Sequence, residues 1–132
     1  MSRLPVRRPS ASVATEHAEQ AALVRWSELA SHRHPELRLL HAIPNGGNRN
    51  IVTAKKLKAE GVKPGVPDLC LPVPIVQYAG LYIELKRRKG GKLSDEQAWW
   101  IAELRRQGYR VEVCRGWDKA RAAIETYLGI RT

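Results

Sequence analysis

Apolar residues recur at the three- and four-residue spacing of amphipathic helices in two long segments of the chain. The first segment runs from Thr15, whose hydroxyl can cap a helix, to about Ser31. The second segment begins near Asp118. The apolar positions are Ala22, Trp26, Leu29 and Ala30 in the first segment and Ala120, Ala123, Ile124, Tyr127 and Leu128 in the second. Both segments are predicted to be helices that bury one face.

Two further helices are predicted between these segments. IVTAKKLKAE is a short basic segment that stops at Gly61, and a longer helix runs from Ser94 to about Gln107. Trp99 and Trp100 are adjacent in the longer helix, so their side chains point in different directions. One of them can lie in the core while the other is exposed.

Four shorter runs have the pattern of strands. They are LRLLHAI, DLCLPV, GLYIELKR and YRVEVCR. The first is followed by NGGNRN, a composition typical of turns, and the second and third are predicted to form a β-hairpin. In the last run Val111 and Val113 alternate with Arg110 and Glu112, which indicates a strand covered on one face.

The order of these elements, αβ(α)ββαβα, predicts an α/β fold in which a small mixed sheet lies between layers of helices. A length of 132 residues is enough for one domain with a substantial core. We expect a flexible basic arm at residues 1–13, because that stretch is rich in Arg, Pro and Ser, and a single domain at residues 14–132.

The charge of the chain indicates a polyanionic partner. Lys and Arg outnumber Asp and Glu by 23 to 13, which gives a formal net charge of +10. A basic surface that serves only solubility is the alternative, and a membrane surface is a weaker one. No apolar run is long enough to span a bilayer and the first residues lack the pattern of a signal peptide, so a cytoplasmic location is expected.

The two cysteines, Cys70 and Cys114, fall in apolar strand-like runs and are predicted to be buried free thiols. His32 and His34 do not complete a zinc-site spacing with them, so no structural zinc is expected.

Acidic and basic side chains in the third strand carry the candidate chemistry. Glu84 and Lys86 are two residues apart and leave the same face of a strand, and a hairpin can bring Asp68 beside them. Two carboxylates and a lysine are the groups that metal-assisted phosphodiester hydrolysis uses, and hard oxygen ligands favour Mg²⁺ or Mn²⁺. The alternative is a solvent-facing ion pair on an edge strand.

VPDL, YIELKRR and GGKLSDEQAWWIAELRRQGYRVEVCRGWDKA, in this order, resemble the VRR-NUC branch of the PD-(D/E)XK nuclease superfamily, and the similarity extends from about Glu16 to Leu128. The resemblance implies a restriction-endonuclease-like core. It also implies that Asp68 and Glu84 ligate Mg²⁺, which Mn²⁺ can replace, and that Lys86 orients or activates the attacking water.

Three further side chains match the family pattern. The resemblance makes Glu16 an outer metal ligand, with Gln20 in support, whereas the alternatives are a charge that favours the helix dipole and a solvated glutamine. It gives Gln97 an active-site role, whereas the alternative is a capping box with Ser94.

Several polar and basic residues are predicted to contact DNA, with an ordinary turn and a solvated basic face as the alternatives. They are Asn45, Arg49, Lys55, Lys56, Arg87, Arg88, Lys89 and Lys92.

The resemblance therefore predicts an endonuclease that hydrolyses DNA, with branched or four-way-junction DNA as the expected substrate and no organic cofactor. A non-catalytic DNA-binding module is the alternative, and an RNA-directed nuclease is a third possibility. Because cutting a junction evenly requires two sites, a homodimer is expected. Val73, Ile75, Val76 and Tyr78 are candidate contacts, unless they cover the core of their own chain.

Overall fold

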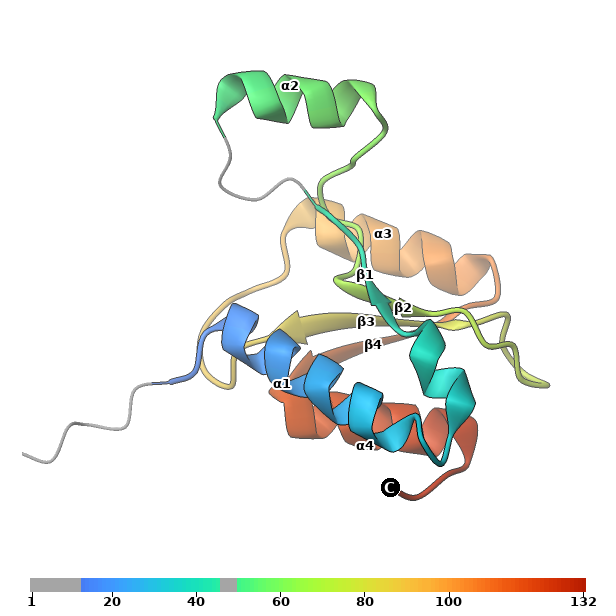
Figure 1. Cartoon of the computed structure of the whole chain (residues 1–132). Helices are drawn as coiled ribbons and strands as arrows, with labels where there is room; N and C mark the ends of the chain where they lie inside the picture. The colour runs from blue at the N-terminus through green and yellow to red at the C-terminus, as the bar shows by residue number, and fades with distance from the viewer. Residues whose placement is uncertain (1–12, 46–49) are drawn as a thin grey trace, which may run out of the picture.

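A four-stranded mixed sheet between helices forms the body of the protein (Figure 1). The computed structural model describes residues 13–45 and 50–132. In chain order the elements are α1 (Glu16–Ala30), a 3-10 helix η1 (Pro35–Leu39), β1 (His41–Ala42), α2 (Ile51–Ala59), β2 (Leu69–Leu71), β3 (Leu81–Lys86), α3 (Asp95–Arg106), β4 (Arg110–Arg115) and α4 (Trp117–Leu128). The predicted α/β order is confirmed, with η1 as an addition.

The sheet has the strand order β1-β2-β3-β4, so β3 is a central strand. β2 pairs antiparallel with β3, with Leu69 opposite Ile83, which confirms the predicted hairpin. β4 pairs parallel with β3 over six residue pairs, and α3 makes the crossover between them. The carboxyl ends of β3 and β4 therefore lie at the same end of the sheet as the start of β2.

The helices form a layer on each side of the sheet (Figure 1). α1 and α4 pack against each other and against β3 on one face, and α3 packs against β4 on the other. Three of the helices begin at side chains that accept a backbone N–H in the first turn: Thr15 for α1, Asn50 for α2 and Ser94 for α3. In the described residues, no helix has the length and apolarity needed to cross a membrane.

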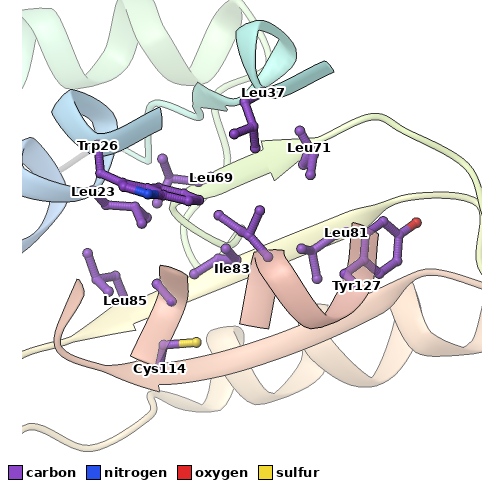
Figure 2. Packing of buried hydrophobic residues seen from close by; sticks show 12 residues of the cluster. Leu23, Trp26, Leu37, Leu69, Leu71, Leu81, Ile83, Leu85, Cys114 and Tyr127 are labelled. Atoms are coloured by element: carbon purple, nitrogen blue, oxygen red, sulfur yellow. The ribbon is translucent and has the colours of Figure 1, made fainter. Parts of the chain in front are cut away.

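The hydrophobic core lies between the sheet and the α1–α4 layer (Figure 2). Leu81, Ile83 and Leu85 of β3 point into it, as their alternation predicted, and Leu23 and Trp26 of α1 cover them. The predicted stripe on α4 is confirmed, because Ala120, Ile124 and Tyr127 are buried and Ala123 and Leu128 pack against the cluster.

Two details of the apolar pattern were interpreted wrongly. LRLLHAI forms η1 and only a two-residue strand, since Pro35 sets the backbone for a helical turn that buries Leu37 under α1. Leu29, assigned to the apolar side of the first helix, is 69% exposed, and Leu23 is the fully buried leucine.

The strand β4 is not covered on one face alone. Val111 is buried on the α3 side and Cys114 in the main core, while Val113 is 37% exposed. Both cysteines are buried and unpaired, as predicted. On α3, Trp99 is 59% exposed and Trp100 half-buried, with their rings edge to face.

The connection between β2 and β3 mostly covers the core of its own chain. Val73, Ile75 and Tyr78 pack against the core cluster, whereas Val76 is fully exposed. Of the four residues considered for a dimer contact, only Val76 is left as a free apolar side chain. The homodimer stays a prediction, and this connection gives it little apolar surface.

Leu23→Ala is expected to lower the free energy of unfolding by about 2–5 kcal/mol, because it removes a fully buried side chain between α1 and β3. Leu29→Ala on the same helix is the matched control and is expected to change it by less than about 0.5 kcal/mol. Urea unfolding followed by circular dichroism measures both. Equal losses in the two variants would contradict the assigned face of α1.

Candidate active site

The pairing of β2 with β3 places two carboxylates next to each other. Extending the register one residue beyond the Leu69–Ile83 pair puts Asp68 opposite Glu84, on the face of the sheet away from the main core. Asp68 accepts a hydrogen bond from the backbone N–H of Leu85 at 2.7 Å and another from Asn45 Nδ2 at 3.3 Å. These bonds fix the orientation of the Asp68 carboxylate.

Glu84 and Lys86 are buried in the central strand, with 1% and 6% of their surfaces exposed. Lys86 Nζ lies 3.6 Å from Glu84 Oε1. The interpretation of these residues as a solvent-facing pair on an edge strand is therefore wrong. Burying charged groups costs free energy, and pairing them recovers only part of that cost. The burial of Glu84 and Lys86 therefore indicates a role other than stabilising the fold.

Gln97 joins the acidic and basic side chains. Its Nε2 donates to Glu84 Oε1 at 2.9 Å, and its Oε1 accepts from Lys86 Nζ at 3.1 Å. The same Oε1 accepts the backbone N–H of Ser94, and Ser94 Oγ accepts the backbone N–H of Gln97. The capping box and the contact with the site, which were alternatives in the sequence, are both present.

The electrostatics of the pair favour a bound proton or a cation. Burial raises the pKa of Glu84 to about 8, and the negative charge of Asp68 adds to this, while Lys86 opposes it. Burial also raises the pKa of Asp68, although the hydrogen bond from Leu85 lowers it. Two neighbouring carboxylates in a largely buried site repel each other when both are ionised. A bound proton or cation removes this repulsion.

One oxygen of the pair lacks a partner. Glu84 Oε2 is buried and, within the described part of the chain, accepts no hydrogen bond. A buried acceptor without a donor is costly, and an unbound ligand position is one explanation. The oxygen donors suit Mg²⁺ or Mn²⁺ in kind. Across residues 13–45 and 50–132, however, no three His, Cys, Asp or Glu side chains group closely enough to enclose a metal ion.

Glu16 lies near this pair without joining it. Its negative charge raises the pKa of both Asp68 and Glu84, and its Oε1 would be 3.9 Å from a Cβ atom at Gly91. This placement is compatible with the outer position predicted for it. Gln20 is half-buried and borders a surface hollow on α1 with His17 and Val24.

Glu19 is an important residue that the sequence pattern did not reveal. It is only 3% exposed, and its carboxylate accepts from Arg88 Nε at 3.2 Å and from the backbone N–H of Trp117. It thereby caps α4, whose own N-cap, Gly116, has no side chain to do so.

The predicted DNA contacts have different surroundings. Arg88 pairs with Glu19 and, at 2.8 Å, with Asp118, so its guanidinium is engaged within the protein. Arg87, Lys89 and Lys92 are exposed.

Arg115 holds the loop that carries these exposed cations. Its guanidinium donates to the carbonyl oxygens of Arg87, Gly90 and Gly91 at 3.3, 2.6 and 3.0 Å. Gly90 and Gly91 have φ values of +74° and +70°, which favour glycine. The turn that follows β3 therefore has a defined shape.

The remaining predicted contacts lie on the segment between β1 and β2. Asn45 is half-buried and bonded to Asp68, while Lys55 and Lys56 are exposed on α2. Arg49 lies outside the described residues, as does the predicted N-terminal arm apart from Val13.

Comparisons with known proteins assign the family. The family model of the VRR-NUC domain matches residues 7–118. A solved structure of a VRR-NUC domain protein superposes with a TM-score of 0.76 at 28% sequence identity, covering 89% of this chain and 91% of that one. No curated protein matches the chain. The match over most of the chain and the shared fold show that this chain belongs to the VRR-NUC family of nuclease domains.

Proposed function

We propose that the protein is an endonuclease that hydrolyses phosphodiester bonds of DNA with the help of Mg²⁺ or Mn²⁺. One observation carries the proposal: Glu84 is buried beside Asp68 and Lys86, with one carboxylate oxygen unpartnered in the described structure. A fold does not need this arrangement, because a packed apolar residue at the centre of a strand is more favourable. A site for cation-assisted hydrolysis does need it.

Asp68 and Glu84 would hold the cation, with Glu16 contributing from farther away. A bound divalent cation neutralises the charge that develops on the phosphate and lowers the pKa of a bound water. Asp68 is oriented for this role by the Leu85 N–H and the Asn45 amide, which leave its remaining lone pairs free for a ligand.

Lys86 supplies positive charge at the reacting oxygens. Its ammonium has three donors, and the hydrogen bond to Gln97 and the ion pair with Glu84 fix its position at the edge of the carboxylate pair. From there it stabilises the negative charge of the attacking oxygen as the water loses its proton. Gln97 forms hydrogen bonds with both Lys86 and Glu84 and so links their geometry to the start of α3.

The non-catalytic alternative explains this site poorly. A module that only binds DNA benefits from exposed cations, and buried carboxylates would repel a phosphate. DNA as the substrate class agrees with the net charge of +10 and with exposed Arg87, Lys89 and Lys92 beside the site. Preference for branched or four-way-junction DNA, and the homodimer that paired cutting would require, are the finer parts of the proposal.

Asp68→Asn and Glu84→Gln are each expected to abolish divalent-ion-dependent cleavage while DNA binding persists, because binding rests on the exposed cations. Purified variants are assayed on linear, flap and four-way-junction DNA with and without Mg²⁺. Glu28→Gln, an exposed change on α1, is the matched control and is expected to cleave normally. Normal turnover by both active-site variants would refute the proposed ligands.

Lys86→Met is expected to lower the cleavage rate by about 10²–10³-fold while metal affinity changes by less than about threefold, since Lys86 acts on the reacting oxygens and does not ligate. Single-turnover cleavage and calorimetric titration with Mn²⁺ separate the two effects. A variant that loses metal binding to the same extent as Glu84→Gln would contradict this role.

Metal affinity is expected to increase with pH, because a cation must displace the proton that the raised pKa of Glu84 retains. Below about pH 8, affinity for Mn²⁺ should fall up to about tenfold per pH unit, and above it the dependence should level off. Calorimetry at several pH values measures this. The Glu84→Gln variant should bind Mn²⁺ more weakly, and its affinity should depend much less on pH. An unchanged pH dependence in this variant would assign the displaced proton to another group.

A further inference from the structure

Within the part of the chain that the structure describes, α2 has no extensive contact with another helix or strand. None of its nine residues is buried, and in Figure 1 it stands apart from the sheet and from the other helices. A helix this short is marginal by itself in water, even with the cap from Asn50 that begins it. An exposed basic helix of this kind is expected to have a binding partner that contributes to its stability.

The exposed surface of α2 has two parts. Its lysines Lys55, Lys56 and Lys58 are all exposed and lie toward the carboxyl end of the helix. In the first turn, Ile51 and Val52 are 73% and 65% exposed. A helix that only faces solvent would have polar residues at these positions, and residues of the core would be buried. The exposed Ile51 and Val52 therefore match neither environment.

Both ends of the segment that carries α2 meet the catalytic site. Before it, Asn45 donates to Asp68 at 3.3 Å. After it, the chain returns through Gly65, with φ of +91°, and buried Pro67 directly into Asp68. A Cβ atom at Gly65 would lie 2.6 Å from the carbonyl carbon of Glu96, so this return rests on the first turn of α3 next to Gln97. The segment that carries α2 is therefore anchored to residues of the candidate site before and after the helix.

We propose that α2 is a DNA-engaging arm with two functions. Its lysines contact phosphates beside the scissile bond, and Ile51 and Val52 pack against a base or sugar that is unstacked at a branch point. Apolar side chains that enter a disrupted base step are an established means of recognising distorted DNA. The inference rests on the proposed DNA substrate and adds the element by which branched DNA is distinguished.

The chemistry of α2 favours DNA over other partners. Between residues 50 and 67 the chain has four lysines and a single acid, Glu60. A second copy that placed α2 against α2 would bring like charges together. An acidic protein surface would pair with the lysines but would leave Ile51 and Val52 in a polar setting. Duplex DNA with an open branch supplies phosphates and apolar base faces side by side.

The lysines are tested by the salt dependence of binding, measured by fluorescence anisotropy in EDTA so that no DNA is cut. The triple variant Lys55→Gln, Lys56→Gln, Lys58→Gln is expected to reduce the slope of log K against log salt on linear duplex by about 2–3, close to 0.9 for each lost phosphate contact. Lys119→Gln, an exposed lysine on α4, is the control and should leave the slope within about one unit. An unchanged slope in the triple variant would overturn this part.

The apolar pair is tested with a four-way junction that carries 2-aminopurine at the branch. Unmodified protein is expected to raise its fluorescence, which reports unstacking. Ile51→Ser combined with Val52→Ser should remove that rise and weaken junction binding at least about tenfold, with a smaller effect on linear duplex. Leu29→Ser, equally exposed on α1, is the matched control. Circular dichroism verifies that each variant is folded.

These measurements do not require catalysis, so they separate the two proposals. Absence of cleavage by the unmodified protein, together with weakened binding in the α2 variants, would refute the nuclease proposal and support the arm. Normal cleavage together with α2 variants that bind and unstack the junction as the unmodified protein does would refute the arm alone. A loss of self-association in the Ile51 and Val52 variant without DNA would identify a second copy as the partner and also overturn it.

Discussion

The buried carboxylate of Glu84 imposes a condition that several parts of the molecule must meet together. It lies at the centre of a sheet, where an apolar side chain would pack with less cost, and its partners come from three elements: Asp68 before β2, Lys86 on β3 and Gln97 on α3. Gln97 is also the third residue of α3 and forms the capping box with Ser94. The same glutamine therefore stabilises the start of α3 and positions Glu84 and Lys86. A displacement of the helix start would also displace these side chains.

The pairing of the strands brings the groups of the candidate site to one end of the sheet. The antiparallel pair β2–β3 places Asp68 opposite Glu84, and the parallel pair β3–β4 brings Arg115 to the end of the sheet where β3 finishes. Arg115 then fixes the loop that follows Lys86 through three carbonyl oxygens. The residues of the candidate site are thus positioned by paired strands and by a turn that Arg115 holds through hydrogen bonds. Exposed cations can vary around it without disturbing the carboxylates.

Much of this could be predicted because it depends on local pattern. The alternation of Leu81, Ile83 and Leu85 placed Glu84 and Lys86 on one face, and Ser94 with Gln97 marked the start of a helix. The failures concern long-range packing. Leu23 and Leu29 are both acceptable apolar positions on α1, and only the placement of α4 and β3 decides that Leu23 is buried. Likewise, an acid such as Glu19 in a first helical turn is ordinary until its distant partners are known.

The contact between Glu19 and the backbone of Trp117 spans 98 residues of sequence. During synthesis, Glu19 emerges long before α4, the helix that it caps. Until α4 has formed, burial of the Glu19 carboxylate would lack the hydrogen bond from Trp117 that compensates for lost hydration. Trp26 likewise donates to Thr132 across 106 residues. The first helix of the body can therefore dock in its final position only after α4 has emerged. A ribosome-bound chain that stops short of Trp117 would therefore carry every proposed catalytic residue in an unfinished fold.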